Sequence, residues 1–167
     1  MSEVPSGSWD SPHPENFARS AGRQDRTPGE TASDEAAGPD PAEVHTWYTT
    51  GLELLGKGSP AAAAQVLQRA ANAEPASRSV REALARAQFD TGRYAEAADN
   101  FRVIVEASPS DDYAHFGLGL ALTRTGDHQA AAEFLALAAA MRPDRKPYTD
   151  ALRQVRATLE ARRRTAD

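Results

Sequence analysis

The chain has 167 residues, a formal net charge of −5 at pH 7 and no cysteine. This length suffices for one domain with a sizeable core, and the lack of cysteine excludes disulfides, thiolate nucleophiles and thiolate metal sites. No apolar run is long enough for a secretory signal or a membrane span, so we expect a soluble, cytoplasmic protein that makes no membrane contact. Arginine dominates over lysine and alanine is abundant, a bias typical of a GC-rich bacterial genome.

Charge is distributed unevenly along the chain. Residues 1–43 carry 3 basic and 9 acidic side chains, residues 44–141 carry 8 and 11, and residues 142–167 carry 8 and 4. This distribution excludes a uniformly basic nucleic-acid-binding protein. The arginine-rich C-terminal end is a local exception, and its arginines could contact phosphates or simply be solvated at a helix end.

Residues 1–42 combine scattered prolines with Gly, Ser and acidic residues and show no helical or strand periodicity. Such a segment buries too little apolar surface to offset its conformational entropy. We therefore predict a disordered acidic tail. Its Trp9 and Phe17 leave open the alternative of an internal ligand for the rest of the chain.

From Val44 onward, Gly, Ala and Pro recur at a fixed interval of 34 residues. The recurring sets are Gly58, Gly92 and Gly126; Ala63, Ala97 and Ala131; and Pro75, Pro109 and Pro143. A period of this length is the signature of a repeat architecture. It predicts a domain over residues 43–165 with repeats at 44–77, 78–111 and 112–145.

Each repeat has the signals of a helical hairpin. The glycine at place fifteen can adopt the left-handed conformation that ends a helix, and in the first repeat Ser59–Pro60 then opens a second helix. The proline at place thirty-two prevents that helix from continuing. Small residues at places eight and twenty let the two helix axes approach closely. A final helix over residues 147–163 is predicted to cap the array.

These columns resemble the tetratricopeptide repeat. The first repeat matches its pattern with Trp47, Gly51, Ala63, Leu67, Ala70 and Pro75; the second with Leu84, Ala85, Tyr94, Ala97, Phe101 and Pro109; the third with Leu118, Gly119, Ala131, Leu135, Ala138 and Pro143. Departures include Thr50 at place seven, Arg81 and His115 at place four, and Gln88 at place eleven.

The resemblance implies an all-α fold: an α-solenoid of three such hairpins plus the C-terminal capping helix. It also implies that the first helices line a concave groove that binds a peptide or partner protein, without catalysis and without a cofactor. We therefore expect a protein–protein interaction scaffold whose partner is not identified by the sequence. Self-association into a homo-oligomer and nucleic-acid contact through the C-terminal arginines are the alternatives.

The candidate site follows from the repeat register. Places two, five, nine and twelve of each first helix share a face distinct from the packing positions, and this face is unusually apolar. With Arg124 added, the predicted groove residues are His45, Tyr48, Leu52, Leu55, Glu82, Arg86, Phe89, Tyr113, Phe116, Leu120 and Arg124. The apolar excess suits an amphipathic helix or an extended apolar segment. The alternative is that some of these residues, Tyr48 and Phe116 first among them, pack against the neighbouring repeat.

More specific activities are not supported by the sequence. Relatives that grip a peptide's C-terminal carboxylate do so with Lys and Asn at places two, five, six and nine, and none of those places carries Lys or Asn here. Arg86 with Arg124 is the remaining cationic pair, although Arg86 is expected to pair with Glu82 one turn away. The histidines fit no metal-ligand spacing, and no catalytic motif is found.

Overall fold

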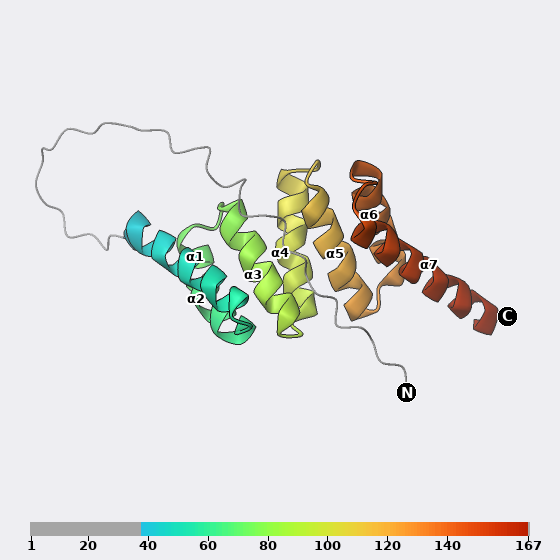
Figure 1. Cartoon of the computed structure of the whole chain (residues 1–167), viewed down its shortest axis with the longest axis horizontal. Coiled ribbons are helices and arrows are strands. Elements are labelled where there is room, and N and C mark those ends of the chain that lie inside the picture. The colour runs from blue at the N-terminus through green and yellow to red at the C-terminus, as the bar shows by residue number, and fades with distance from the viewer. Residues whose placement is uncertain (1–37, 167) are drawn as a thin grey trace, which may run out of the picture. The chain divides into compact units, whose positions relative to one another are not determined.

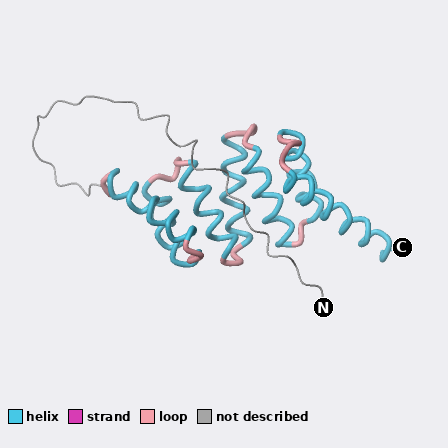
Figure 2. The backbone as a smooth tube through the Cα atoms, viewed as in Figure 1, coloured by secondary structure: helices cyan, strands magenta, loops and turns pink. Residues whose placement is uncertain are grey.

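The computed structural model describes residues 38–166, and this part of the chain consists of helices joined by short loops, without a strand (Figure 2). The helices, labelled in Figure 1, are α1 (Pro41–Gly56), α2 (Pro60–Ala73), α3 (Arg78–Asp90), α4 (Tyr94–Ala107), α5 (Asp112–Thr125), α6 (His128–Met141) and α7 (Lys146–Ala166). None of these helices is long and apolar enough to cross a membrane. The predicted acidic tail lies outside the described residues except for residues 38–42, of which Pro41 and Ala42 begin α1.

The fold is the predicted one: three helical hairpins followed by a final helix. Gly58, Gly92 and Gly126 have φ values of 72°, 81° and 93°, in the left-handed region that glycine enters without steric cost. Each of them lies in the turn between the two helices of its hairpin, as the 34-residue period predicted. The period therefore marks the turns of the structure.

The helix starts are capped unequally. Asp111 accepts a hydrogen bond from the backbone N–H of Ala114 at 3.1 Å, and Asp127 does the same for Ala130 at 3.1 Å. Ser59 and Ser77 occupy the expected N-cap positions, but neither side chain makes a capping hydrogen bond. The boundary before α2 is therefore set by Pro60 at the start of the helix rather than by the serine hydroxyl.

The hairpins stack so that the first helices form the inner layer of the array. Each helix packs against the next along the chain, and α1 also contacts α3, α3 contacts α5, and α5 contacts α7. No such contact links α2 with α4 or α4 with α6. Because the first helices lie closer to one another than the second helices do, the described array curves with α1, α3, α5 and α7 on its inner side.

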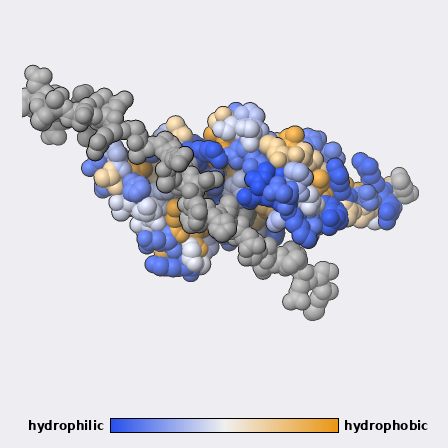
Figure 3. All heavy atoms as spheres, turned by 45° about the horizontal axis from the view of Figure 1, so that its top comes forward, coloured by the Kyte–Doolittle hydropathy of each residue, from blue (hydrophilic) through white to orange (hydrophobic). Residues whose placement is uncertain are grey.

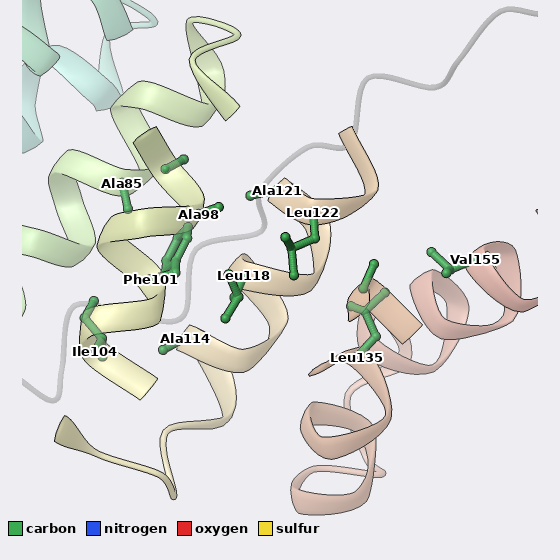
Figure 4. Close-up of a cluster of buried hydrophobic side chains, with 12 residues drawn as sticks. Ala85, Ala98, Phe101, Ile104, Ala114, Leu118, Ala121, Leu122, Leu135 and Val155 are labelled. Atoms are coloured by element: carbon green, nitrogen blue, oxygen red, sulfur yellow. The ribbon is translucent and has the colours of Figure 1, made fainter. Parts of the chain in front are cut away.

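The core runs through the array as a chain of buried apolar side chains. Its largest cluster joins Phe101 of α4, Leu118 and Leu122 of α5, Leu135 of α6 and Val155 of α7 (Figure 4). At Gly119 a Cβ atom would lie 2.6 Å from Leu135 Cγ, so α5 and α6 approach too closely for a side chain there. The small residue at place eight is required by this packing, as predicted.

Candidate functional site

The predicted site residues lie on the inner layer. All of them except Arg124 occupy places two, five, nine and twelve of α1, α3 and α5, which we call the first-helix face. Its members differ widely in exposure. His45 is exposed and Leu52 keeps 36% of its surface accessible, whereas Leu55 and Leu120 are half-buried and pack against the apolar core. The α1 end of the face is therefore its most accessible apolar part.

Phe116 is largely used within the fold. Its ring stacks on Tyr148 of α7 with centroids 4.4 Å apart and planes 27° from parallel. The Tyr148 hydroxyl donates a hydrogen bond of 2.8 Å to the Asp112 carboxylate, and burial, with this hydrogen bond, raises the pKa of Tyr148. For Phe116 the alternative noted from the sequence, packing against the neighbouring helix, is the observed arrangement.

Phe89 also has partners inside the array. It meets Tyr94 edge to face at a centroid distance of 5.1 Å. The Arg124 guanidinium lies 5.7 Å from the centroids of both rings, a distance at which a cation is attracted to an aromatic face. This cluster joins α3, α4 and α5, so its contacts with the two rings position Arg124, which lies one place beyond the first-helix face.

The centre of the face joins three first helices through polar groups. Tyr48 of α1 is half-buried and packs against an apolar cluster that α2 and α3 form together. Its pKa is raised by burial and by the nearby Glu82 carboxylate. Tyr113 of α5 has its pKa raised mainly by burial, although the charge of Arg86 opposes that shift. Arg86 of α3 therefore lies within electrostatic reach of tyrosines on both neighbouring helices.

The predicted Glu82–Arg86 ion pair does not form in the structure. The Arg86 Nε atom is buried without a hydrogen-bond partner. Burial and the neighbouring Asp111 carboxylate raise the pKa of Glu82. Asp111 itself pairs with Arg78 at 2.7 Å. Glu82 and Arg86 thus influence each other electrostatically without direct contact.

Two residues that the sequence analysis did not assign to the site lie next to its α5 part: Arg145, just before α7, and the buried Tyr148 of α7. Arg145 lies 5.6 Å from the centroid of the Tyr148 ring and within electrostatic reach of Tyr113. Extending the 34-residue register past the third repeat would have placed Tyr148 at the position of Ala114 and so pointed to an aromatic residue beside Phe116. In the described part of the chain, no three His, Asp or Glu side chains gather closely enough to hold a metal ion.

The curved stack of helical hairpins defines this chain as a helical-repeat protein. Two tetratricopeptide repeat models match it, one over residues 48–112 and the other over residues 89–155. The chain belongs to the tetratricopeptide repeat family.

Solved structures with the same fold include several tetratricopeptide repeat domains. The first such domain of Spaghetti (RPAP3) bound to an HSP90 peptide has a TM-score of 0.68 at 18% identity, covering 74% of this chain and 98% of that one. The Sgt2 domain from Aspergillus fumigatus has a TM-score of 0.68 at 19% identity, covering 81% and 90%. YrrB, a repeat protein with an unusual peptide-binding site, has a TM-score of 0.62 at 23% identity, covering 65% and 56%. No curated protein matches the sequence.

Proposed function

We propose that this protein is a non-catalytic interaction module that binds a peptide or a segment of a partner protein on the first-helix face. The observation that carries the proposal is the curvature of the array, because three consecutive first helices on the inner side converge on one surface. That surface combines an accessible apolar residue, Leu52, with a half-buried cation, Arg86. Neighbours of this fold include domains solved with HSP90 and HSP70 peptides, which is consistent with such a role.

The chemistry of the face favours a different ligand from those peptides. The Lys and Asn residues expected of a carboxylate clamp are missing at places two, five, six and nine. An apolar side chain beside Leu52 and Leu55, together with a hydrogen-bond acceptor for Arg86, would satisfy the groups that the face presents. We therefore propose a mainly apolar segment, helical or extended.

The experiment uses the full chain, a selected peptide and a matched pair of exposed residues. A peptide library is screened for binders, and the affinity of one binder is measured by fluorescence anisotropy. We expect Leu52→Asp and Arg86→Ala each to weaken binding at least about tenfold, or about 1.4 kcal/mol. Val103 of α4 is exposed to a similar degree (43%) as Leu52 but lies outside the first-helix face. Val103→Asp should therefore leave the affinity unchanged.

Two results would contradict the proposal: unchanged affinity in both face variants, or an equal loss in Val103→Asp. Circular dichroism on each variant shows whether the helices remain intact. Sedimentation of the unliganded chain is measured at the same concentrations to detect self-association. Self-association through the first-helix face would compete with the peptide, and the apparent affinity for the peptide would then depend on protein concentration.

A further inference from the structure

Helix α7 continues the repeat register beyond the third repeat. Tyr148, Leu152 and Val155 follow Ala114, Leu118 and Ala121 of α5 at the same 34-residue interval. Tyr148 and Val155 are buried at 2% exposure, as Ala114 and Ala121 are at 0%, and α7 packs against α6. In its contacts, α7 is therefore the first helix of a fourth repeat.

In each complete repeat, the first helix is covered by a second helix. On α5 the covered residues include His115, Leu118 and Leu122, which are 4%, 0% and 7% exposed, together with Gly119 in contact with Leu135 of α6. Counting 34 residues on, α7 carries Thr149, Leu152, Arg153 and Arg156 at these places. No described helix follows α7, and these residues, with Ala157 and Glu160, line a shallow depression. We call this surface the α7 outer face.

The α7 outer face has an apolar floor and a basic rim. Leu152 is half-buried and Ala157 is exposed. Arg153 keeps 75% of its side chain accessible while pairing with Asp150 at 2.9 Å. At helical spacing, Arg156, Arg163 and Arg164 project on this same side. Towards the C-terminal end of α7, hydrophilic side chains dominate the surface shown in Figure 3. The face therefore combines the position of a helix-packing surface with a net positive charge.

We infer that the α7 outer face docks an acidic amphipathic helix of a partner protein, in the position that the second helix takes in each of the three repeats. The apolar floor would meet its apolar stripe, and its carboxylates would meet Arg153 and Arg156. Arg153 replaces the small residue at place eight, so this helix lies farther from α7 than α6 does from α5, at a separation that charged side chains can bridge.

Two other occupants fit the face less well. A second copy of α7 in a symmetric pair would bring arginines against arginines, which is unfavourable for like charges. A nucleic acid would use the arginines but would gain little from the apolar Leu152 and Ala157. The acidic helix uses both the charge and the apolar floor, so it is the occupant that the residues favour.

The chain itself supplies a probe with this chemistry. A peptide with the α4 sequence, residues 94–107, has the apolar stripe of a second helix in Ala97, Phe101 and Ile104, flanked by Glu96, Asp99 and Glu106. Binding of the labelled peptide to the full chain is measured by fluorescence anisotropy at low salt. We expect a dissociation constant below about 1 mM and at least a tenfold weakening in Arg156→Glu.

The matched control is Arg162→Glu, which makes the same charge change in the same helix but on a different side, about 120° around the helix axis from Arg156. Its affinity should stay within about threefold of the unmodified chain, and circular dichroism confirms that both variants keep their helices. A peptide in which the three acidic residues are replaced by Gln or Asn should bind more weakly than the probe. Absence of binding at 1 mM, or equal losses in the two arginine variants, would overturn the inference. So would binding of a DNA duplex that is lost in Arg156→Glu while the peptide does not bind, which would identify a nucleic-acid surface.

Discussion

At the scale of single residues, the second and third repeats approach each other closely at Gly117 and Phe101. A Cβ atom at Gly117 would lie 2.5 Å from the Cζ atom of Phe101, and the Phe101 ring is fully buried, so it has no free space to move into. The other two repeats carry Leu67 and Leu135 at the place of Phe101. The larger ring in the second repeat is therefore matched by a glycine on α5.

This contact predicts that Gly117→Ala destabilises the protein although alanine is the better helix former. The helix propensity gain is about 1 kcal/mol, whereas overpacking a buried contact costs about 1–3 kcal/mol. Because the ring cannot retreat, we expect a net loss of about 1 kcal/mol or more in the free energy of unfolding, measured by urea denaturation.

A double-mutant cycle separates the contact from the backbone effect. In a Phe101→Leu background the added methyl group has room, so Gly117→Ala should be neutral or stabilising there. Gly56, which has nothing within 4 Å of a built Cβ, serves as the exposed control, and Gly56→Ala should not destabilise. Equal losses from Gly117→Ala in the unmodified chain and in the Phe101→Leu background would refute the steric explanation.

At the scale of the element, the two helices of the second hairpin, α3 and α4, are joined by a chain of hydrogen-bonded polar side chains. Gln88 of α3 is 2% exposed and accepts a hydrogen bond of 2.7 Å from Asn100 Nδ2. Arg81 donates in turn to the Asn100 amide oxygen at 2.9 Å. Arg81 and Gln88 are the two positions at which this repeat departs most from the tetratricopeptide pattern, and Asn100 of α4 satisfies both.

We expect Asn100→Ala to destabilise the protein by about 1–3 kcal/mol, because it leaves the buried Gln88 amide oxygen without its hydrogen-bond donor. Urea unfolding followed by circular dichroism measures the loss. Asn72→Ala is the matched control: Asn72 accepts a hydrogen bond of 2.9 Å from Gln68 on the exposed surface of α2, and its loss should cost less than about 0.5 kcal/mol. A similar loss in the free energy of unfolding at both sites would show that the buried hydrogen bonds of Asn100 stabilise the protein no more than an exposed hydrogen bond does.

Sequence periodicity predicted the hairpins well because each turn depends on local chemistry. Gly58, Gly92 and Gly126 mark the turns. Between these turns the apolar residues recur at helical spacing, a pattern that can be read without knowing which helices pack together. The partners of the site residues were less predictable. Phe116 stacks on Tyr148, and Gln88 binds Asn100, and these partners lie on other helices. Their pairing depends on how the hairpins stack, which residue spacing within one helix does not encode.

At the scale of the whole described array, the second and third hairpins bury more residues than the first hairpin does. In α1 the buried residues are Val44 and Gly51, and in α2 they are alanines and Leu67. The largest core cluster instead extends from Ala85 on α3 to Val155 on α7. Since each unit of a repeat array is stabilised mainly by its neighbours, the first hairpin has the weakest support.

The uneven core predicts that the first hairpin opens at a lower free energy than the third. Local opening is measured by native-state hydrogen exchange, and we expect faster exchange over residues 41–73 than over residues 112–155. Leu67→Ala and Leu135→Ala should each lower the free energy of unfolding by about 2–5 kcal/mol. The two variants should differ in which helices exchange faster. The first should accelerate exchange mainly in α1 and α2, whereas the second should accelerate it from α4 to α7, because Leu135 belongs to the cluster that joins those helices. Uniform protection along the array, or the same exchange profile in both variants, would instead indicate that it unfolds as a single cooperative unit.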